Sequence, residues 1–205
     1  MKTILCFGDS NTYGLKPDGT GRFDRSVRYP GRLQELLGGN YYVIEEGCPG
    51  RTTVFDDINN PYKKGIDYFI PCLRSHVPLD YIVIMLGTND CKTVYNASPE
   101  GIASGLAVLA ASARVIAPEA KVLIISPIHL GENVWKPGYD IEFDAESVQK
   151  SKALAAEYKK VAEKTGSLFL DAAQVASASK IDEEHLDENG HYALALAISE
   201  IIRKE

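Results

Sequence analysis

Short apolar runs rich in β-branched residues alternate along the chain with longer stretches in which apolar residues recur every three or four positions. This alternation is typical of βαβ units, in which helices connect the strands of a parallel sheet. Two of the runs are apolar almost throughout, as strands that helices cover on both faces must be. The pattern predicts five strands, at residues 3–7, 42–45, 81–86, 121–126 and 167–171.

The stretches between the predicted strands carry start and stop signals for helices. Ser98 and Pro99 provide an N-cap and a first-turn proline for a helix that stops before Pro118. Asp144 can cap a second long helix, and Gly166 can end it. Further helices are expected at residues 30–37 and 65–75 and at the C-terminus, where Leu194, Ile198 and Ile202 share an apolar stripe.

These elements predict a flavodoxin-like fold, a three-layer α/β/α sandwich around a five-stranded parallel sheet. Right-handed crossovers favour the strand order 2-1-3-4-5. The sequence has neither an internal repeat nor a low-complexity linker, so we expect residues 1–205 to form one domain. Sheets of this kind bind ligands beyond the carboxyl ends of their strands. The residues that follow each strand are therefore the first candidates for function.

A polar turn that contains glycine follows each of the first three predicted strands. The turn at residues 8–11 places the hydroxyl of Ser10 where the strand ends, so Ser10 is either a nucleophile or the cap of a following helix. Asn89, in the turn at residues 87–90, could donate to an oxyanion or satisfy a local Asx-turn. Gly50 follows the second strand and offers a backbone N–H that no side chain obstructs.

Asp182 and His185 stand three residues apart just before the last predicted helix. At this spacing a carboxylate can hold one ring nitrogen of the imidazole, as the orienting acid of a general base does. His191 competes for the role of base, but it lies in the start of the helix, and the acid three positions before it, Glu188, belongs to the capping turn. We therefore favour His185.

Charge and cysteine content exclude several classes of function. The chain has 22 basic and 28 acidic residues, a net charge of −6 at pH 7 and no basic stripe, so we expect neither nucleic acid nor a membrane as a partner. The first apolar run is too short for a signal peptide, which favours a cytoplasmic location. Cys6, Cys48, Cys72 and Cys91 form no CxxC pair and have no histidine at zinc-finger spacing, so we expect reduced thiols and no metal.

Four sequence blocks, taken in order, resemble those of the SGNH, or GDSL-type, hydrolases. The blocks are Gly8-Asp9-Ser10-Asn11, Gly50, Gly87-Thr88-Asn89-Asp90 and Asp182-Glu183-Glu184-His185, and they span essentially the whole chain. The residues around the first three blocks look most like the arylesterase and acyltransferase branch, which acts on small acyl esters. The chain departs from many members at Asn11, where they have Leu, and at Cys48-Pro49-Gly50, where they have Ser before the glycine.

The resemblance implies a serine esterase that hydrolyses small-acyl, acetyl-type carboxylic esters through an acyl-enzyme and needs no cofactor. Transfer of the acyl group to an alcohol is a second activity that the resemblance implies. The resemblance also implies that Ser10 is the nucleophile, His185 the base and Asp182 the residue that orients the base. The oxyanion hole would consist of the N–H groups of Ser10 and Gly50 and the side chain of Asn89. We expect the ester to contact Asp9, Asn11, Cys48, Thr88 and Trp135.

Residues 130–143 carry Trp135, Tyr139 and Phe143, and this segment is too long and too aromatic for a plain connection. It could form a lid over the site or an interface between subunits. Members of the branch that the chain resembles often form closed homo-oligomers, so we expect a homo-oligomer.

A non-catalytic module that binds a phosphate or a nucleotide on the same loops is the alternative to an esterase. Backbone N–H groups of such loops do bind anions. This reading gives Asp182 and His185 no role, and the chain lacks both GxGxxG and GxxxxGK[ST].

Overall fold

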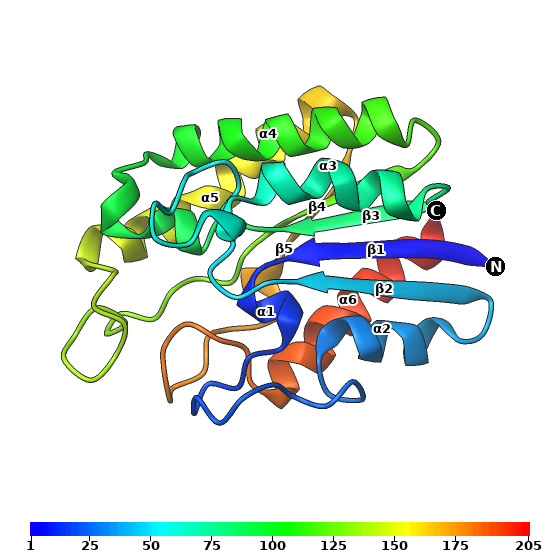
Figure 1. Ribbon diagram of the computed structural model, residues 1–205. Coiled ribbons are helices and arrows are strands. Elements are labelled where there is room, and N and C mark those ends of the chain that lie inside the picture. Colours follow the sequence, from blue (N-terminus) through cyan, green and yellow to red (C-terminus); the bar gives the residue numbers. More distant parts are fainter.

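A five-stranded parallel sheet forms the centre of the computed structural model, which describes residues 1–205 (Figure 1). Every neighbouring pair of strands runs parallel. The predicted order 2-1-3-4-5 and the α/β/α sandwich are therefore confirmed. In spatial order the strands are β2 (Tyr41–Gly47), β1 (Lys2–Gly8), β3 (Tyr81–Met85), β4 (Lys121–Ser126) and β5 (Leu168–Asp171).

Helices cover both faces of the sheet (Figure 1). One face carries α3 (Gly65–His76), α4 (Pro99–Ile116) and α5 (Ala145–Thr165), and the other carries α2 (Tyr29–Leu37) and α6 (Glu188–Lys204). Along β1, Leu5 and Phe7 pack into the first of these layers while Ile4 and Cys6 pack into the second. Because successive side chains of a strand point to opposite faces, two covered faces require the continuous apolar runs seen in the sequence.

The long helices begin and end at the predicted signals. The Ser98 side chain accepts a hydrogen bond from Gly101 N, and Asp144 forms a capping box with Ser147. Gly166 ends α5 in the left-handed conformation, with φ of 64°. By length and composition alone, α4 is long and apolar enough to cross a membrane, but core helices of globular proteins meet the same criteria. The inner face of α4 packs in the core.

The first turn after β1 is packed directly onto the ends of two strands. This turn is the short helix α1 (Ser10–Tyr13). A Cβ atom on Gly8 would lie 2.0 Å from Oγ1 of Thr12, and one on Gly47 would lie 2.1 Å from Tyr13 N. Only glycine permits this approach, so the two strand-end glycines fix the position of Ser10.

Residues 130–143 contain no regular helix or strand and divide into buried and exposed parts. Val134 and Phe143 are buried in the core on the α4 side of the sheet, whereas Trp135 is 38% exposed. Phe143 is thus a core residue, so of the three aromatic side chains only Trp135 and Tyr139 are available for a lid or an interface. The remaining short elements are the 3-10 helices η1 (Pro61–Lys63), η2 (Asn89–Cys91), η3 (Thr93–Tyr95) and η4 (Ala172–Gln174).

Candidate active site

Ser10 lies at the carboxyl end of β1, as the first residue of α1. The carboxylate of Asp9 caps this helix, since its Oδ1 accepts a hydrogen bond from Asn11 N at 3.0 Å. Thr12 Oγ1 and Tyr29 OH, 3.0 Å apart, join the helix to α2. These contacts hold Ser10, which is only 3% exposed, in one position at the edge of the sheet.

His185 and Asp182 come from the loop that precedes α6, and they complete a chain of side chains with Ser10. His185 Nε2 lies 2.9 Å from Ser10 Oγ, and His185 Nδ1 lies 2.6 Å from Oδ2 of Asp182. The other Asp182 oxygen accepts hydrogen bonds from the backbone N–H groups of Glu184 and His185, at 3.1 and 3.0 Å. This geometry lets the imidazole take a proton from the hydroxyl while the carboxylate orients the ring.

Acidic neighbours dominate the electrostatics of His185. Burial lowers the pKa of this histidine, but the hydrogen bond that it donates to Asp182 and the charge of Glu184, 4.0 Å from Nε2, outweigh burial and raise the pKa above its usual value. Burial likewise raises the pKa of Asp182, and its bonds to His185 lower it by more. Both shifts favour the imidazolium–carboxylate pair that forms when the base accepts a proton.

The loops that follow β2 and β3 are tied to each other and to β1. Asn89 Nδ2 donates to the carbonyl oxygen of Arg51 at 3.2 Å, and Arg51 Nη1 donates to the carbonyl oxygen of Gly8 at 2.9 Å. Gly50 has φ of +78°, and its N–H donates to no protein acceptor. The three predicted oxyanion donors thus come from loops at one edge of the sheet, where they can stabilise negative charge that develops on a substrate oxygen.

A buried carboxylate adds a second connection between these two loops. Asp90 accepts hydrogen bonds from the backbone N–H of Thr53 at 2.9 Å and from the Thr53 hydroxyl. Burial raises the pKa of Asp90 to about 6, although these bonds oppose the shift. Donors held by such contacts need no rearrangement when charge develops on a substrate.

The residues expected to contact the ester lie at different depths. Asn11 is buried, and its side-chain oxygen accepts a hydrogen bond from Leu186 N at 2.8 Å, so it holds the His185 loop instead of facing the ester. Asp9 and Thr88 are buried too, and burial raises the pKa of Asp9 to about 7. Cys48 is half-buried and Trp135 is exposed, so both stay candidates for contact with a ligand.

His191, the competing base, is a core residue. It is fully buried, its Nδ1 accepts a hydrogen bond from Tyr29 N at 3.2 Å, and its ring meets that of Phe23 edge-on. Burial lowers its pKa to about 4. The structure thus brings His185, and not His191, to Ser10.

Sequence reasoning assigned no role to Glu183 and Glu184, the two residues between Asp182 and His185. Glu184 is buried beside the imidazole. Glu183 adopts φ of 60°, a left-handed conformation that costs a residue with a side chain on the order of 1 kcal/mol. Its carboxylate accepts from Asn133 N at 2.9 Å and its carbonyl from Gly131 N at 2.7 Å, so Glu183 attaches residues 130–143 to the loop that carries the base. A non-glycine residue with positive φ leaves no signal in the sequence.

Potential metal ligands occur away from Ser10. Glu46 on β2 and Cys72 and His76 on α3 bring their ligand atoms within 4.8 Å of one another. They lie on the α3 side of the sheet and share no residue with the Ser10 site.

Comparison with family models matches residues 6–193 to the GDSL-like lipase/acylhydrolase family. The match spans most of the chain, and the chain therefore belongs to this family. Comparison with curated proteins found no match.

Solved structures resemble the whole chain. An aryl esterase from M. smegmatis is 37% identical, with a TM-score of 0.93 over 100% of this chain and 99% of that one. A carbohydrate acetylesterase from Sinorhizobium meliloti is 33% identical, with a TM-score of 0.92 over 100% and 99% of the two chains. A G-D-S-L family protein from Veillonella parvula shares the fold at 16% identity, with a TM-score of 0.74 over 100% of both chains.

The family and its esterase neighbours identify the chain as a carboxylic ester hydrolase. The alternative of a non-catalytic phosphate- or nucleotide-binding module is therefore wrong. Esterases and phosphate-binding modules of this fold have the same sheet and Gly-containing loops. They differ in the side chains that these loops carry.

Proposed function

We propose that the chain hydrolyses small-acyl, acetyl-type esters with Ser10 as nucleophile, His185 as general base and Asp182 as its orienting acid. The observation that carries the proposal is the 2.9 Å separation between Ser10 Oγ and His185 Nε2, with Nδ1 of the same ring held by Asp182. A hydroxyl in this setting can lose its proton as it attacks, which makes it a nucleophile at neutral pH.

The reaction proceeds in two halves. His185 takes the Ser10 proton as Oγ bonds to the ester carbonyl carbon, and the carbonyl oxygen becomes an oxyanion that accepts from Ser10 N–H, Gly50 N–H and Asn89. His185 then protonates the leaving alcohol as its C–O bond breaks, which leaves Ser10 acylated. In the second half His185 deprotonates a water that attacks the acyl carbon, and Ser10 regains its proton on release of the acid. Neither half needs a cofactor or a metal.

The preference for a small acyl group is supported by the closed surroundings of the reacting atoms. Ser10 is 3% and His185 7% exposed, so only a small part of either residue is accessible to a substrate. The two similar esterases are described as an aryl esterase and a carbohydrate acetylesterase. An alcohol that attacks the acyl-enzyme in place of water would receive the acyl group, so acyl transfer is a second activity of the same intermediate.

Exposed apolar side chains near the site support a homo-oligomer. Ile58 and Val94 line one cavity beside Glu142, and Ile141 is exposed next to it in sequence. A second subunit seated there would remove this surface from water. We also propose a cytoplasmic location, because the four cysteines are free thiols, as a reducing compartment requires.

Turnover of p-nitrophenyl acetate by the wild type and by Ser10→Ala tests the proposed nucleophile. We expect the variant to lose hydrolysis and to keep the wild-type circular dichroism spectrum, because the change removes one buried oxygen atom and little packing. Turnover at the wild-type rate by Ser10→Ala would exclude Ser10 as nucleophile.

A chain-length series of p-nitrophenyl esters, run with light scattering, tests the acyl preference and the assembly. We expect the acetyl ester to react fastest and the particle to exceed the 22.4 kDa of one chain. A monomer that prefers long acyl chains would contradict both proposals.

A further inference from the structure

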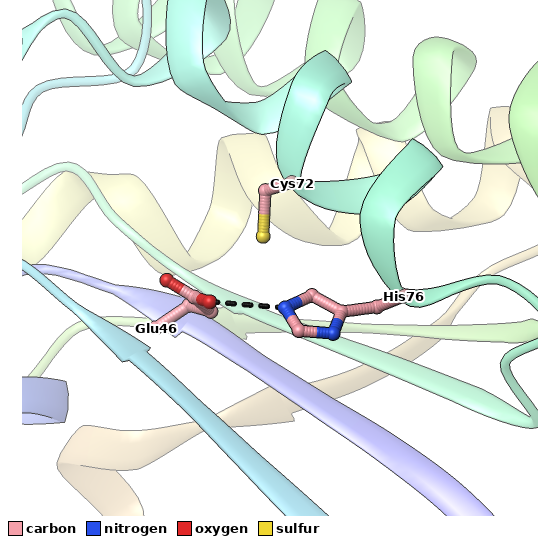
Figure 2. A group of neighbouring side chains, drawn as sticks. All are labelled: Glu46, Cys72 and His76. Atoms are coloured by element: carbon pink, nitrogen blue, oxygen red, sulfur yellow. Dashed lines mark hydrogen bonds and ion pairs between the residues drawn. The ribbon is translucent and has the colours of Figure 1, made fainter.

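Glu46, Cys72 and His76 form a compact group of three different ligand types on the α3 side of the sheet (Figure 2). Cys72 and His76 stand one turn apart on α3, so both side chains lie on the helix face that meets β2. Glu46, near the end of β2, lies opposite His76, and its Oε1 is 3.1 Å from Nε2 of that histidine. Figure 2 shows the Cys72 sulfur directed toward this pair.

We propose that Glu46, Cys72 and His76 form a binding site for a thiophilic divalent cation, with Zn²⁺ as the best match. Zinc in proteins takes thiolate sulfur, imidazole nitrogen and carboxylate oxygen, usually four ligands in a tetrahedron. The three side chains supply one ligand of each kind, and water would take the fourth position.

The spacing of the ligand atoms fits this ion after small side-chain rotations. Ligands about 2.0–2.3 Å from a tetrahedral zinc ion lie roughly 3.3–3.8 Å from one another. The three ligand atoms lie within 4.8 Å of one another, and the closest pair, from Glu46 and His76, is 3.1 Å apart. Closure by about 1 Å is within reach of rotations of the glutamate and histidine side chains, which are 20% and 29% exposed.

The positions of the three side chains also suit a bound ion. Cys72 lies in the core and closes the site on its inner side, while Glu46 and His76 leave a path from solvent. Tyr68 OH donates to Oε2 of Glu46 at 3.2 Å and so orients the carboxylate, as outer partners of metal ligands commonly do. A thiolate and a carboxylate neutralise the two positive charges of the ion, so the nearby Arg51 would face a neutral centre.

Arg51 connects this site to the loops that hold the proposed oxyanion donors. The carbonyl oxygen of Glu46 accepts a hydrogen bond from Arg51, whose own carbonyl accepts from Asn89. A cation that fixes Glu46 against α3 would therefore also stiffen the loop that carries Gly50. The sequence did not predict this site, because the third ligand, Glu46, comes from a distant strand and no second cysteine or histidine lies near Cys72 and His76 in the sequence.

Co²⁺ titration of the metal-stripped, phosphine-reduced chain tests the proposal directly. We expect one equivalent of Co²⁺ to produce a thiolate charge-transfer band and the visible bands of a tetrahedral site, and added Zn²⁺ to remove both. Cys72→Ser should abolish the charge-transfer band. His76→Gln should weaken Co²⁺ affinity about tenfold or more. Cys48→Ser is the matched control, because it removes a half-buried thiol without a histidine partner, and it should keep the band.

Thermal unfolding provides a second readout, which does not depend on Cys72→Ser folding. Zn²⁺ should raise the Tm of the wild type, since a ligand that binds only the folded state stabilises it, and should raise that of His76→Gln by less. A wild type without a charge-transfer band at millimolar Co²⁺, a band that survives in Cys72→Ser, or equal Zn²⁺ stabilisation of wild type and His76→Gln would overturn the proposal. None of these readouts involves ester hydrolysis, so the proposal stands or falls separately from the proposed function.

Discussion

The side-chain oxygen of Asn11 accepts a hydrogen bond from the backbone N–H of Leu186 at 2.8 Å. Asn11 directly follows the proposed nucleophile Ser10, and Leu186 directly follows the proposed base His185. One hydrogen bond thus connects the end of β1 to the loop before α6 and sets the separation of the two reacting side chains. We therefore expect Asn11 to act as a positioning residue whose effect on catalysis passes through His185.

Asn11→Ala should lower both stability and kcat. The change leaves the buried N–H of Leu186 without an acceptor, which costs about 1–3 kcal/mol of unfolding free energy. It also frees the His185 loop, so kcat should fall while KM changes little. Urea unfolding and steady-state hydrolysis of p-nitrophenyl acetate measure the two effects. Asn40→Ala, an exposed position at the other end of the sheet, is the control and should change neither. An effect on KM alone would show that Asn11 contacts substrate.

Asn89→Ala should lower kcat by about two to three decades, or roughly 3–4 kcal/mol of transition-state stabilisation. The amide would donate to the oxyanion and only weakly to the ground-state carbonyl, so KM should stay within a few-fold of the wild-type value. Stopped-flow acylation and steady-state kinetics separate the two parameters. If KM rises and kcat does not fall, Asn89 serves in substrate binding and the oxyanion hole must lie elsewhere.

The pH dependence of kcat/KM should report the acidic surroundings of His185. The base must be neutral to accept the Ser10 proton, so activity rises as pH passes upward through its pKa. Burial lowers that pKa, but Asp182 and Glu184 raise it by more, which places the acidic limb of the profile above the usual histidine range near 6.5. Glu184→Gln removes a negative charge 4.0 Å from Nε2 and should move the limb to lower pH.

Glu188→Gln is the matched control for the pH profile, because Glu188 is an exposed acid at the start of α6. Its profile should superimpose on that of the wild type. An unmoved limb in Glu184→Gln, or one that moves upward, would contradict the assigned effect of Glu184.

His191 should make the fold sensitive to acid without affecting catalysis. Its pKa is lowered by burial to about 4 in the folded chain, against about 6.5 when unfolded. The unfolded state therefore binds a proton first as pH falls, and stability is lost between about pH 6.5 and 4. At about 1.4 kcal/mol per unit of pKa, this loss approaches 3 kcal/mol.

His191→Asn keeps an acceptor for Tyr29 N and cannot titrate, so its unfolding free energy should fall less between pH 6.5 and 4 than that of the wild type. At pH 7 it should retain most esterase activity, whereas His185→Asn should lose it. Urea unfolding at several pH values and one activity assay test both statements. Equal activity losses in the two variants would return His191 to consideration as the base.

Contacts between residues close in sequence were predictable without the fold. Asp182 and His185 meet because one turn of loop brings residues three apart together, and the caps at Ser98 and Asp144 depend on the same short range. The apolar runs predicted strands that are covered on both faces, and the preference for right-handed crossovers favoured the strand order. The family resemblance then placed Ser10, Gly50 and Asn89 at a common edge of the sheet.

Contacts between distant segments were decided only by the tertiary structure. The role of Asn11 depends on where the loop before α6 packs, and burial of His191 depends on the docking of α2 against α6. Likewise, Glu46 faces Cys72 and His76 only because α3 lies beside β2. Residue type and spacing fix what a side chain can bind within a turn. Which distant residue a side chain contacts depends on how the helices pack against the sheet, because the interior of the protein must be filled without voids.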